Sequence, residues 1–250
     1  NHIYNIAIKR EFYGHEIAGI KLHAAIDTQI YHNHIHNCSL GIWLDWEAQG
    51  TRVSRNLFYA NNRDLFIEVT HGPHLVDHNI LGSRYSLDNH AQGGAYVNNL
   101  FAGKIVVHKI LDRSTPYHYP HSTEVSGFTV VHGGDDRFFR NLFVEAEKKD
   151  VVLGTAIYEG YHDSWESYIQ EIRDFGQGDH EEFMKVQQPV YLKDNLYLDG
   201  AKAGPQEHEA QVEGFATHYK IEVDNEKVYL VLDLPEDLPE FSKPVHMKDL

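Results

Sequence analysis

The stretch "DWEAQGTRVSRNLF", residues 45–58, returns 43 residues later as "DNHAQGGAYVNNLF", residues 88–101, with Ala-Gln-Gly and Asn-Leu-Phe in the same places. The end of this phrase, an asparagine next to apolar residues, also occurs elsewhere in the chain. It is found at Asn33, Asn56, Asn79, Asn99 and Asn141, at spacings of 23, 23, 20 and 42 residues. Self-similarity with a period of roughly 20 to 50 residues is typical of solenoids, in which each repeat stacks on its neighbours.

Each period contains short Val, Ile, Leu and Phe segments separated by Asn, Gly and Asp, and no convincing helix precedes residue 160. Parallel strands normally need a crossover helix, but a coil of this length returns to its start by winding. Asparagine tolerates the left-handed backbone of a sharp turn, and stacked asparagines can hydrogen-bond in a ladder. We therefore expect an all-β fold, a parallel β-helix. A leucine-rich repeat is the alternative, but its L-x-x-L-x-L phrase is missing.

The repeat is interrupted after Asn141. The segment "HDSWESYIQEIRDFG", residues 162–176, has the apolar spacing of one amphipathic helix, within an insertion at about 146–187. From about residue 202 the pattern alternates around an Asp-Asn turn, which indicates an antiparallel hairpin. The expected domains are the β-helix at 1–201, and at 202–250 part of a second, antiparallel, sandwich-like β domain.

The charge balance of 22 basic against 37 acidic residues leaves a net charge of −15. This excess argues against nucleic acid or an anionic membrane surface as a partner. No apolar run reaches the roughly 18 residues that a membrane span needs. With Cys38 as the single cysteine, an internal disulfide is excluded, so the chain either lies in a reducing compartment or does not rely on cross-links. We expect a cytoplasmic protein with no nucleic-acid and no membrane partner.

Two carboxylates occupy the same place in successive coils. "GIWLD" ends at Asp45, and "DLFIE", 23 residues further on, ends at Glu68. Strands about 4.8 Å apart would hold the two carboxyls roughly 5 Å apart, as in retaining glycosidases, whereas inverting enzymes need about 6.5–9.5 Å. Like charges at that distance do not both ionise freely, so one group tends to stay protonated as an acid. One period earlier the column continues with His23, and the long sequence match places Asp88 one period later.

Strand alternation sends Ile42 and Leu44 inward, and it sends Trp43 outward beside Asp45. In the next coil Phe66 takes the place of Trp43. An aromatic wall next to carboxylates suits the apolar face of a sugar ring. The alternative is that these rings only cover the coils under a long loop. The role of Trp46 is left open, because it could line a cleft wall or cover the coils.

Other candidate sites carry weaker signals. His32, His34 and His36 alternate along one strand and could bind zinc, but no Cys or carboxylate lies at matching spacing and Asn33 interrupts the strand. We therefore expect solvated or hydrogen-bonded histidines, no metal and no cofactor. "HGGDD", which ends at Asp136, is either a calcium loop or an Asp-capped turn, the second being commoner. "RSTPYHYPHST", residues 113–123, is either a cleft wall or an Ω-loop. Neither a G-x-S-x-G motif nor a phosphate-binding glycine loop is present.

Five phrases together resemble the glycoside hydrolase family 120 β-xylosidases over about residues 10–200. They are "FYGHEIAGIKLH" (12–23), "GIWLDWEAQG" (41–50), "DLFIEVTHGP" (64–73), "RSTPYHYPHST" (113–123) and "HGGDDRFFRNLF" (132–143). The resemblance implies a right-handed parallel β-helix catalytic domain with an accompanying β-sandwich. It also implies retaining hydrolysis that releases xylose from the non-reducing end of β-1,4-xylo-oligosaccharides.

Carried over residue by residue, the resemblance places the nucleophile on Asp45 and the general acid/base on Glu68. The sugar-binding pair of the family falls on His15 and Glu16. The full expected substrate-binding set is His15, Glu16, His23, Trp43, His71 and Asp88. The family is longer at its amino end, and this chain begins at Asn1 in strand-like sequence, so we expect the remaining N-terminal part of the same protein as a partner. A homo-oligomer is left open.

Two rival functions remain at this stage. The first is a pectin- or uronate-directed lyase or hydrolase, which would need Arg or Lys for substrate carboxylates, and the column is acidic and poor in both. The second is a non-catalytic carbohydrate-binding β-helix. The sequence does not distinguish xylose from arabinose or galactose.

Overall fold

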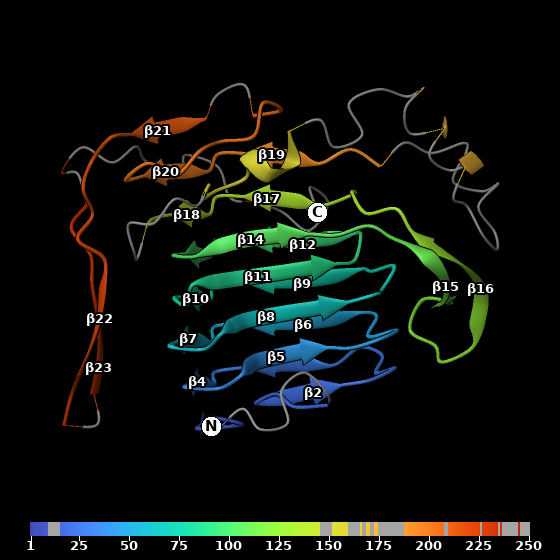
Figure 1. The fold of residues 1–250 in the computed structure, drawn as a ribbon, viewed down its shortest axis with the longest axis horizontal. Coiled ribbons are helices and arrows are strands. Elements are labelled where there is room, and N and C mark those ends of the chain that lie inside the picture. Colours follow the sequence, from blue (N-terminus) through green and yellow to red (C-terminus); the bar gives the residue numbers. More distant parts are fainter. Residues whose placement is uncertain are drawn as a thin grey trace.

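The structure is a computed structural model that describes most of the chain. The described residues are 1–9, 16–145, 152–159, 188–207, 210–225 and 227–234, together with 166, 169–170, 173–174, 236 and 245. Nearly all regular structure in them is β-strand, arranged in layers that follow one another along the chain (Figure 1). None of their helical segments has the length and apolar character needed to cross a membrane.

Three parallel sheets contain most of the strands. The five-stranded sheet consists of β2 (Ile20–Leu22), β5 (Leu40–Leu44), β8 (Arg63–Glu68), β11 (Tyr85–His90) and β14 (Lys104–Val107). The six-stranded sheet consists of β3 (Gln29–Tyr31), β6 (Thr51–Ser54), β9 (His74–Asp77), β12 (Gly94–Val97), β17 (Arg137–Phe139) and β19 (Tyr191–Lys193). The eight-stranded sheet consists of β1 (His2–Tyr4), β4 (His34–His36), β7 (Leu57–Tyr59), β10 (Ile80–Leu81), β13 (Leu100–Phe101), β18 (Leu142–Phe143), β20 (Leu196–Leu198) and β21 (Gln211–Glu213).

Two antiparallel hairpins accompany these sheets. β15 (Ile110–His118) pairs with β16 (Val125–Val131), and β22 (Lys220–Asp224) pairs with β23 (Lys227–Val231). In Figure 1 they lie at opposite ends of the parallel layers. The first contains most of the Pro- and His-rich segment 113–123, which the sequence left open between a cleft wall and an Ω-loop.

The fold class predicted from the sequence is corrected by this arrangement. Within the described residues the structure is all-β, with three separate parallel sheets, almost no helix and no closed barrel, in place of a right-handed parallel β-helix with a helical insertion. The one helical element with defined bounds is the 3-10 turn η1 (Ala156–Tyr158). Of the predicted helix at 162–176, the structure describes only residues 166, 169–170 and 173–174, which are helical, and most of the insertion lies outside the described residues. Repeat spacing specifies which strands pair, but it does not specify how the strands of one repeat divide among sheets.

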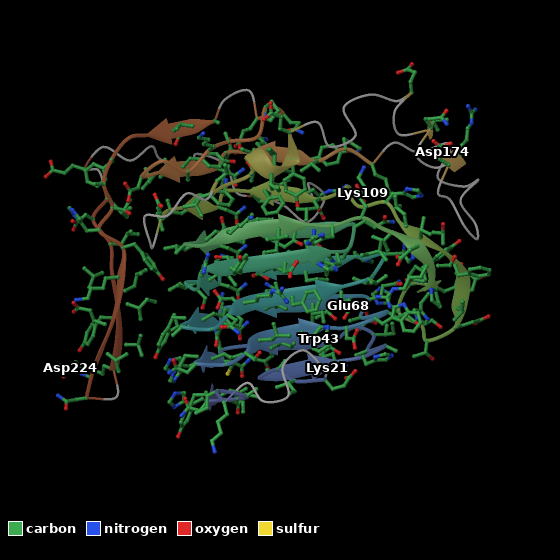
Figure 2. All side chains as sticks on the ribbon, viewed as in Figure 1. Lys21, Trp43, Glu68, Lys109, Asp174 and Asp224 are labelled. Carbon is green, nitrogen blue, oxygen red and sulfur yellow. The ribbon has the colours of Figure 1, made fainter. Side chains whose placement is uncertain are left out.

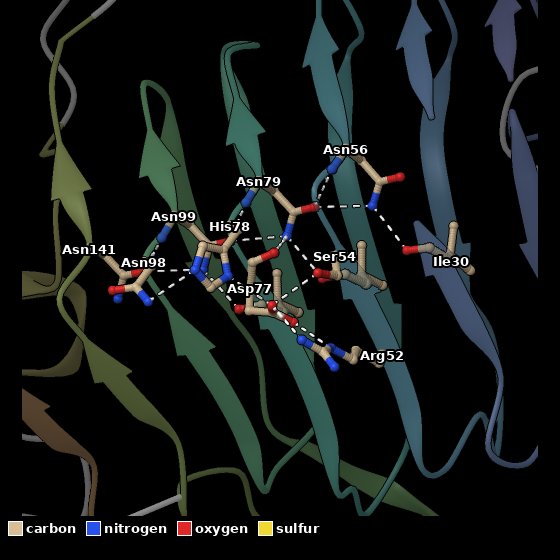
Figure 3. Close-up of polar contacts among 12 residues, drawn as sticks. Ile30, Arg52, Ser54, Asn56, Asp77, His78, Asn79, Asn98, Asn99 and Asn141 are labelled. Atoms are coloured by element: carbon tan, nitrogen blue, oxygen red, sulfur yellow. Dashed lines mark hydrogen bonds and ion pairs between the residues drawn. The ribbon is translucent and has the colours of Figure 1, made fainter. Parts of the chain in front are cut away.

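The predicted asparagine ladder is confirmed (Figure 3). In each step the backbone N–H and the side-chain Nδ2 of one asparagine donate to Oδ1 of the next, at 2.9 and 3.0 Å between Asn56 and Asn79. The same pattern links Asn33, Asn56, Asn79, Asn99, Asn141 and Asn195 in turn. The last step ends on the buried Glu207 carboxylate. These bonds satisfy buried polar groups at one turn of every repeat and so fix the vertical alignment of the strands.

The core lies between the sheets and follows the predicted alternation. Ile42, Leu44, Leu65 and Ile67 are fully buried in the main apolar cluster. The intervening side chains face away from this core, and Trp43 and Phe66 form a separate small cluster with Leu40. The five-stranded sheet therefore has an outer face with its own aromatic and charged side chains, and this face carries the candidate site.

Candidate active site

The pairing of β5 with β8 brings Asp45 and Glu68 together. Trp43 lies opposite Phe66 and Leu44 opposite Ile67, so the next residues of the two strands are the two carboxylates. β2 lies on the other side of β5, and its pairing places His23 beside Asp45. The predicted column of His23, Asp45 and Glu68 is therefore confirmed by the register.

A cleft of about 480 Å³ opens over these strand ends. It is lined by Glu16, His23, Ser39, Leu40, Trp43, Asp45, Trp46, Arg63, Phe66, Glu68 and Arg113. Lys21, Trp43 and Glu68 lie on the three successive strands β2, β5 and β8, on the same face of the sheet (Figure 2). Acidic, basic and aromatic side chains thus converge on one concave surface, and a concave site with convergent polar groups is the usual place for a small-molecule ligand.

Asp45 is held as a carboxylate by several donors. Lys21 Nζ lies 2.5 Å and His23 Nδ1 3.1 Å from Oδ2, while the backbone N–H of Trp46 donates to Oδ1 at 2.7 Å. Burial acts to raise the pKa of Asp45, but the hydrogen bonds from Lys21, Trp46 and His23 outweigh it, so the net pKa is lowered. The side chain is thus ionised at neutral pH and fixed in orientation.

The surroundings of Glu68 shift its pKa in the opposite direction, upward. Burial raises the pKa of Glu68, and the negative charge and contact of Asp45 raise it further, against the opposing effect of Arg113. Trp43 Nε1 donates to Oε2 at 3.1 Å, and an Arg113 guanidinium nitrogen lies 3.1 Å from Oε1. The two neighbouring carboxyls are therefore driven apart in pKa, one toward the anion and the other toward the protonated acid.

Lys21 is a site residue that the sequence reading missed. Its ammonium group contacts both Glu16 and Asp45, and it lies 4.5 Å from the ring centre of Trp43. Burial acts to lower the pKa of Lys21, but the bonds to the two carboxylates outweigh it and raise the pKa. The same register that gave the carboxylate column would have placed Lys21 opposite Trp43. His15, the other half of the predicted sugar-binding pair with Glu16, lies outside the described residues.

Trp43 and Trp46 both belong to the cleft. Trp43 is only 7% exposed, because Lys21 covers its ring and Phe66 packs on it with ring centres 5.4 Å apart. Trp46 lines the cleft and donates from Nε1 to the Thr115 hydroxyl of β15 at 3.1 Å. Trp43 thus forms part of the floor and orients Glu68, while Trp46 joins the floor to the hairpin.

The hairpin β15–β16 forms a side of the cleft through Arg113. Gln49 anchors it by exchanging two hydrogen bonds of 3.1 Å with the backbone of His118. His71 anchors it at a second point, where Nε2–H donates to the Thr115 carbonyl at 2.9 Å. Burial lowers the pKa of His71 to about 4, so the ring is neutral. The structure thus places His71 behind the hairpin and outside the set of residues that line the cleft.

The predicted position of Asp88 in the carboxylate column is wrong. Asp88 pairs with Phe66 and His90 pairs with Glu68, so His90 continues the column. The long sequence match holds along strands β6 and β12. Extending it backward to Asp88 crosses the turn before β12, which is shorter than the corresponding turn of the preceding repeat. Five residues separate Glu68 from His74, but only three separate His90 from Gly94. This two-residue difference shifts Asp88 into the neighbouring column of Trp43 and Phe66.

The column contains more basic residues than its sequence suggested. Lys21 contacts Asp45, Arg113 contacts Glu68, and Arg63 Nε lies 3.0 Å from Asp88 Oδ2. Each of these cations is paired with a protein carboxylate. Binding of a substrate carboxylate would therefore compete with an existing ion pair, which weighs against uronate chemistry for a different reason.

Among the described residues, two clusters bring three potential metal ligands together. One consists of Asp88, His90 and His108 beside the cleft, and the other of His2, His34 and His36 on the eight-stranded sheet. In the first, the Asp88 carboxylate is already bound by the Arg63 cation and by His90 at 3.0 Å, and a nearby positive charge opposes a metal ion. The possible calcium loop behaves as a structural turn, because Asp136 is fully buried and accepts the Gly94 N–H at 3.0 Å.

Replacement of Lys21 with Met should move the acidic limb of the pH profile. Because the hydrogen bond from Lys21 helps to hold the Asp45 pKa down, its loss raises that pKa. Any activity that needs ionised Asp45 should then be lost at a higher pH as the pH falls, so the variant loses more activity at pH 5 than at pH 7. The measurement is kcat/KM against pH. The control is Lys104→Met on β14, at the far edge of the same sheet, and an unshifted acidic limb in Lys21→Met would refute this assignment.

Comparisons with known proteins add one finding. No family model and no curated protein matches the chain. Among solved structures, the chain matches one described as the complex structure of XylC with xylose, at 59% sequence identity and a TM-score of 0.83. The match covers 95% of this chain and 37% of that chain. The chain is therefore similar, over nearly its whole length, to a part of a protein that binds xylose, and it spans well under half of that protein's length.

Proposed function

We propose that the protein is a retaining β-xylosidase, of the kind found in glycoside hydrolase family 120. It would release xylose from the non-reducing end of β-1,4-xylo-oligosaccharides. The observation that carries the proposal is the pair of neighbouring carboxyls in the cleft, Asp45 with a lowered pKa and Glu68 with a raised pKa. The similarity to the XylC–xylose structure supports xylose as the sugar.

The reaction proceeds by two displacements. In the first, protonated Glu68 donates its proton to the glycosidic oxygen while the Asp45 carboxylate attacks the anomeric carbon and forms a glycosyl ester. In the second, Glu68, now ionised, takes a proton from water, and this water displaces Asp45 from the anomeric carbon. Two inversions leave the product with the configuration of the substrate. The places of the two residues on adjacent strands, which lie about 4.8 Å apart, support this course, because an inverting site needs room for a water between its carboxyls.

The surrounding residues have supporting roles in this proposal. Lys21 and His23 hold Asp45 in one orientation, and Trp43 and Arg113 hold Glu68. Glu16 and His23 line the cleft and would bind ring hydroxyls, together with His15 by resemblance. Further residues of the same protein would complete the pocket, because this chain corresponds to only 37% of the XylC chain. We also propose that a second domain follows the catalytic domain. The boundary predicted at 202 moves past β21 in this proposal, because β21 still pairs with β20 in the eight-stranded sheet.

A panel of nitrophenyl glycosides, assayed on the complete protein, tests the sugar specificity. The β-D-xyloside should give the highest kcat/KM, ahead of the α-L-arabinofuranoside, the β-D-galactoside and the β-D-glucuronide. A pocket that fits xylose refuses an exocyclic CH₂OH or carboxylate by shape, and one such group is worth about 1–3 kcal/mol, or roughly 10- to 200-fold. Preference for the glucuronide would support the uronate rival, and no hydrolysis of any member would support a binding module.

A further inference from the structure

Three histidines converge on the outer face of the eight-stranded sheet, away from the cleft. β1 pairs with β4 so that His2 lies opposite His34, and His36 follows two residues later on the same face. The residue between them on β4, Ile35, is fully buried in the core, so the histidines point outward. The cleft belongs to the five-stranded sheet, and the hairpin at its side lies at the other end of the layers from β4 (Figure 1).

The ring nitrogens lie close enough to share one ion. One ligand atom from each histidine lies within 4.8 Å of the others, and the Nε2 atoms of His2 and His36 are 2.7 Å apart. The ring centres of His2 and His34 are 4.4 Å apart, and those of His34 and His36 are 4.7 Å apart. Tetrahedral coordination at about 2.0–2.1 Å places ligand nitrogens roughly 3.4 Å apart, so only small side-chain rotations are needed.

Neighbouring groups orient His34 and His36 and lower their pKa values. Burial lowers the pKa of His34 to about 4, with the nearby His36 and His2 as further causes, and burial also lowers the pKa of His36. Neutral imidazole is the form that binds metal. The Tyr59 hydroxyl lies 3.0 Å from His34 Nε2, and the Asn37 amide lies 2.8 Å from His36 Nδ1. A turned Asn37 amide would accept Nδ1–H and leave Nε2 of His36 free for a metal, which is the usual arrangement around a ligand histidine.

We propose that His2, His34 and His36 form a binding site for a divalent first-row transition metal, with Zn²⁺ as its best occupant. Three imidazoles without a carboxylate select zinc, nickel or copper over calcium or magnesium, which prefer oxygen ligands. Three protein ligands leave the fourth position to water. The site differs from the strand triplet considered from the sequence, because His2 from β1 takes the place of His32. The sequence could not show this, since His2 and His34 are 32 residues apart.

A stacked aromatic ladder is the competing explanation of this cluster. Tyr4, His36 and Tyr59 do stack, with ring centres 5.4 and 4.9 Å apart. Stacking requires overlapping rings, however, and does not require that nitrogens from both columns turn toward one point. His2 and His36 also contact each other across the columns, with ring centres 5.0 Å apart and a hydrogen bond between their Nε2 atoms, and this contact brings ring nitrogens of both columns to one point.

Metal titration of the purified protein separates the two explanations. We expect one equivalent of Co²⁺ to give the visible absorption of a tetrahedral site, with Zn²⁺ displacing it, and Zn²⁺ affinity to fall more than about 100-fold in His36→Gln and His2→Gln. Tyr59→Phe, which removes a partner of a ligand, should weaken binding by roughly 10- to 100-fold. His32→Gln is the matched control and should bind as the unchanged protein does.

A second cluster completes the test. Equal Zn²⁺ affinity in the His36→Gln variant and the unchanged protein would overturn the proposal. So would loss of the Co²⁺ spectrum in His90→Gln with its retention in His36→Gln, which would place the ion beside Asp88. Far-ultraviolet circular dichroism checks that each variant is folded.

Discussion

The Asp45→Asn variant should lose at least roughly 10⁴-fold in kcat/KM for an aryl β-xyloside, the scale on which removal of a nucleophile acts. Asparagine nearly matches the shape of aspartate and can still accept the Trp46 N–H, but its amide oxygen does not form the glycosyl ester. The loss should appear in kcat and with good and poor leaving groups alike, because both steps of the reaction pass through this oxygen.

The control for Asp45 is Asp77→Asn on β9. Asp77 is a buried carboxylate of the same kind, with a lowered pKa, 4% exposure and an ion pair to Arg52, but it lies on the six-stranded sheet (Figure 3). The Asp77→Asn variant should retain nearly full activity in its folded fraction. Near-normal turnover by Asp45→Asn would rule out the proposed nucleophile, and an equal loss in both variants would point to a general effect of buried carboxylates on folding.

The Glu68→Ala variant should show a loss that depends on the leaving group. For a xyloside with a poor leaving group, kcat/KM should fall by roughly 10²–10⁴-fold, the usual contribution of general acid catalysis. For an activated dinitrophenyl xyloside, formation of the ester should be nearly unaffected, and its hydrolysis should become slow. The alkaline limb of kcat/KM should also disappear. That limb reflects loss of the Glu68 proton as the pH rises through a pKa that burial and Asp45 have raised.

Azide provides the decisive readout for Glu68. It should restore turnover of the dinitrophenyl substrate by Glu68→Ala and give β-xylosyl azide, because the anion attacks the ester without needing a base. Recovery of the α-azide would mean inversion. Glu47→Ala is the control, a carboxylate bound by His118 at 3.1 Å as Glu68 is bound by Arg113, and azide should not accelerate it.

The parts of the site that the sequence predicted are those fixed by strand register. A spacing of 23 residues was enough to place Asp45 beside Glu68, because adjacent strands of one sheet keep a constant offset. The asparagine ladder and the inward direction of Ile42 and Leu44 follow from the same repeat. The all-β class was predicted, but the β-helix architecture was wrong, because repeat spacing carries no information on how strands divide among sheets.

The parts that failed depend on turns and on distant segments. Asp88 was misplaced because one turn is two residues shorter than its counterpart. Arg113 reaches Glu68 from a hairpin 45 residues further along the chain, and no periodic pattern connects them. Lys21 is a different case. The repeat spacing that aligns β2 with β5 already places Lys21 opposite Trp43, on the outward face, so the sequence contains the signal for this residue.

In the proposed reaction Asp45 and Glu68 act as nucleophile and acid/base on one xyloside. Trapping with an activated 2-deoxy-2-fluoro-β-xyloside identifies the nucleophile, because the fluorine slows hydrolysis of the ester more than its formation. Mass spectrometry of the digested protein should show one fluoroxylosyl group on the peptide that contains Asp45, with activity lost in proportion to labelling. No adduct at full inactivator concentration, or an adduct on Glu68, would show that Asp45 is not the nucleophile.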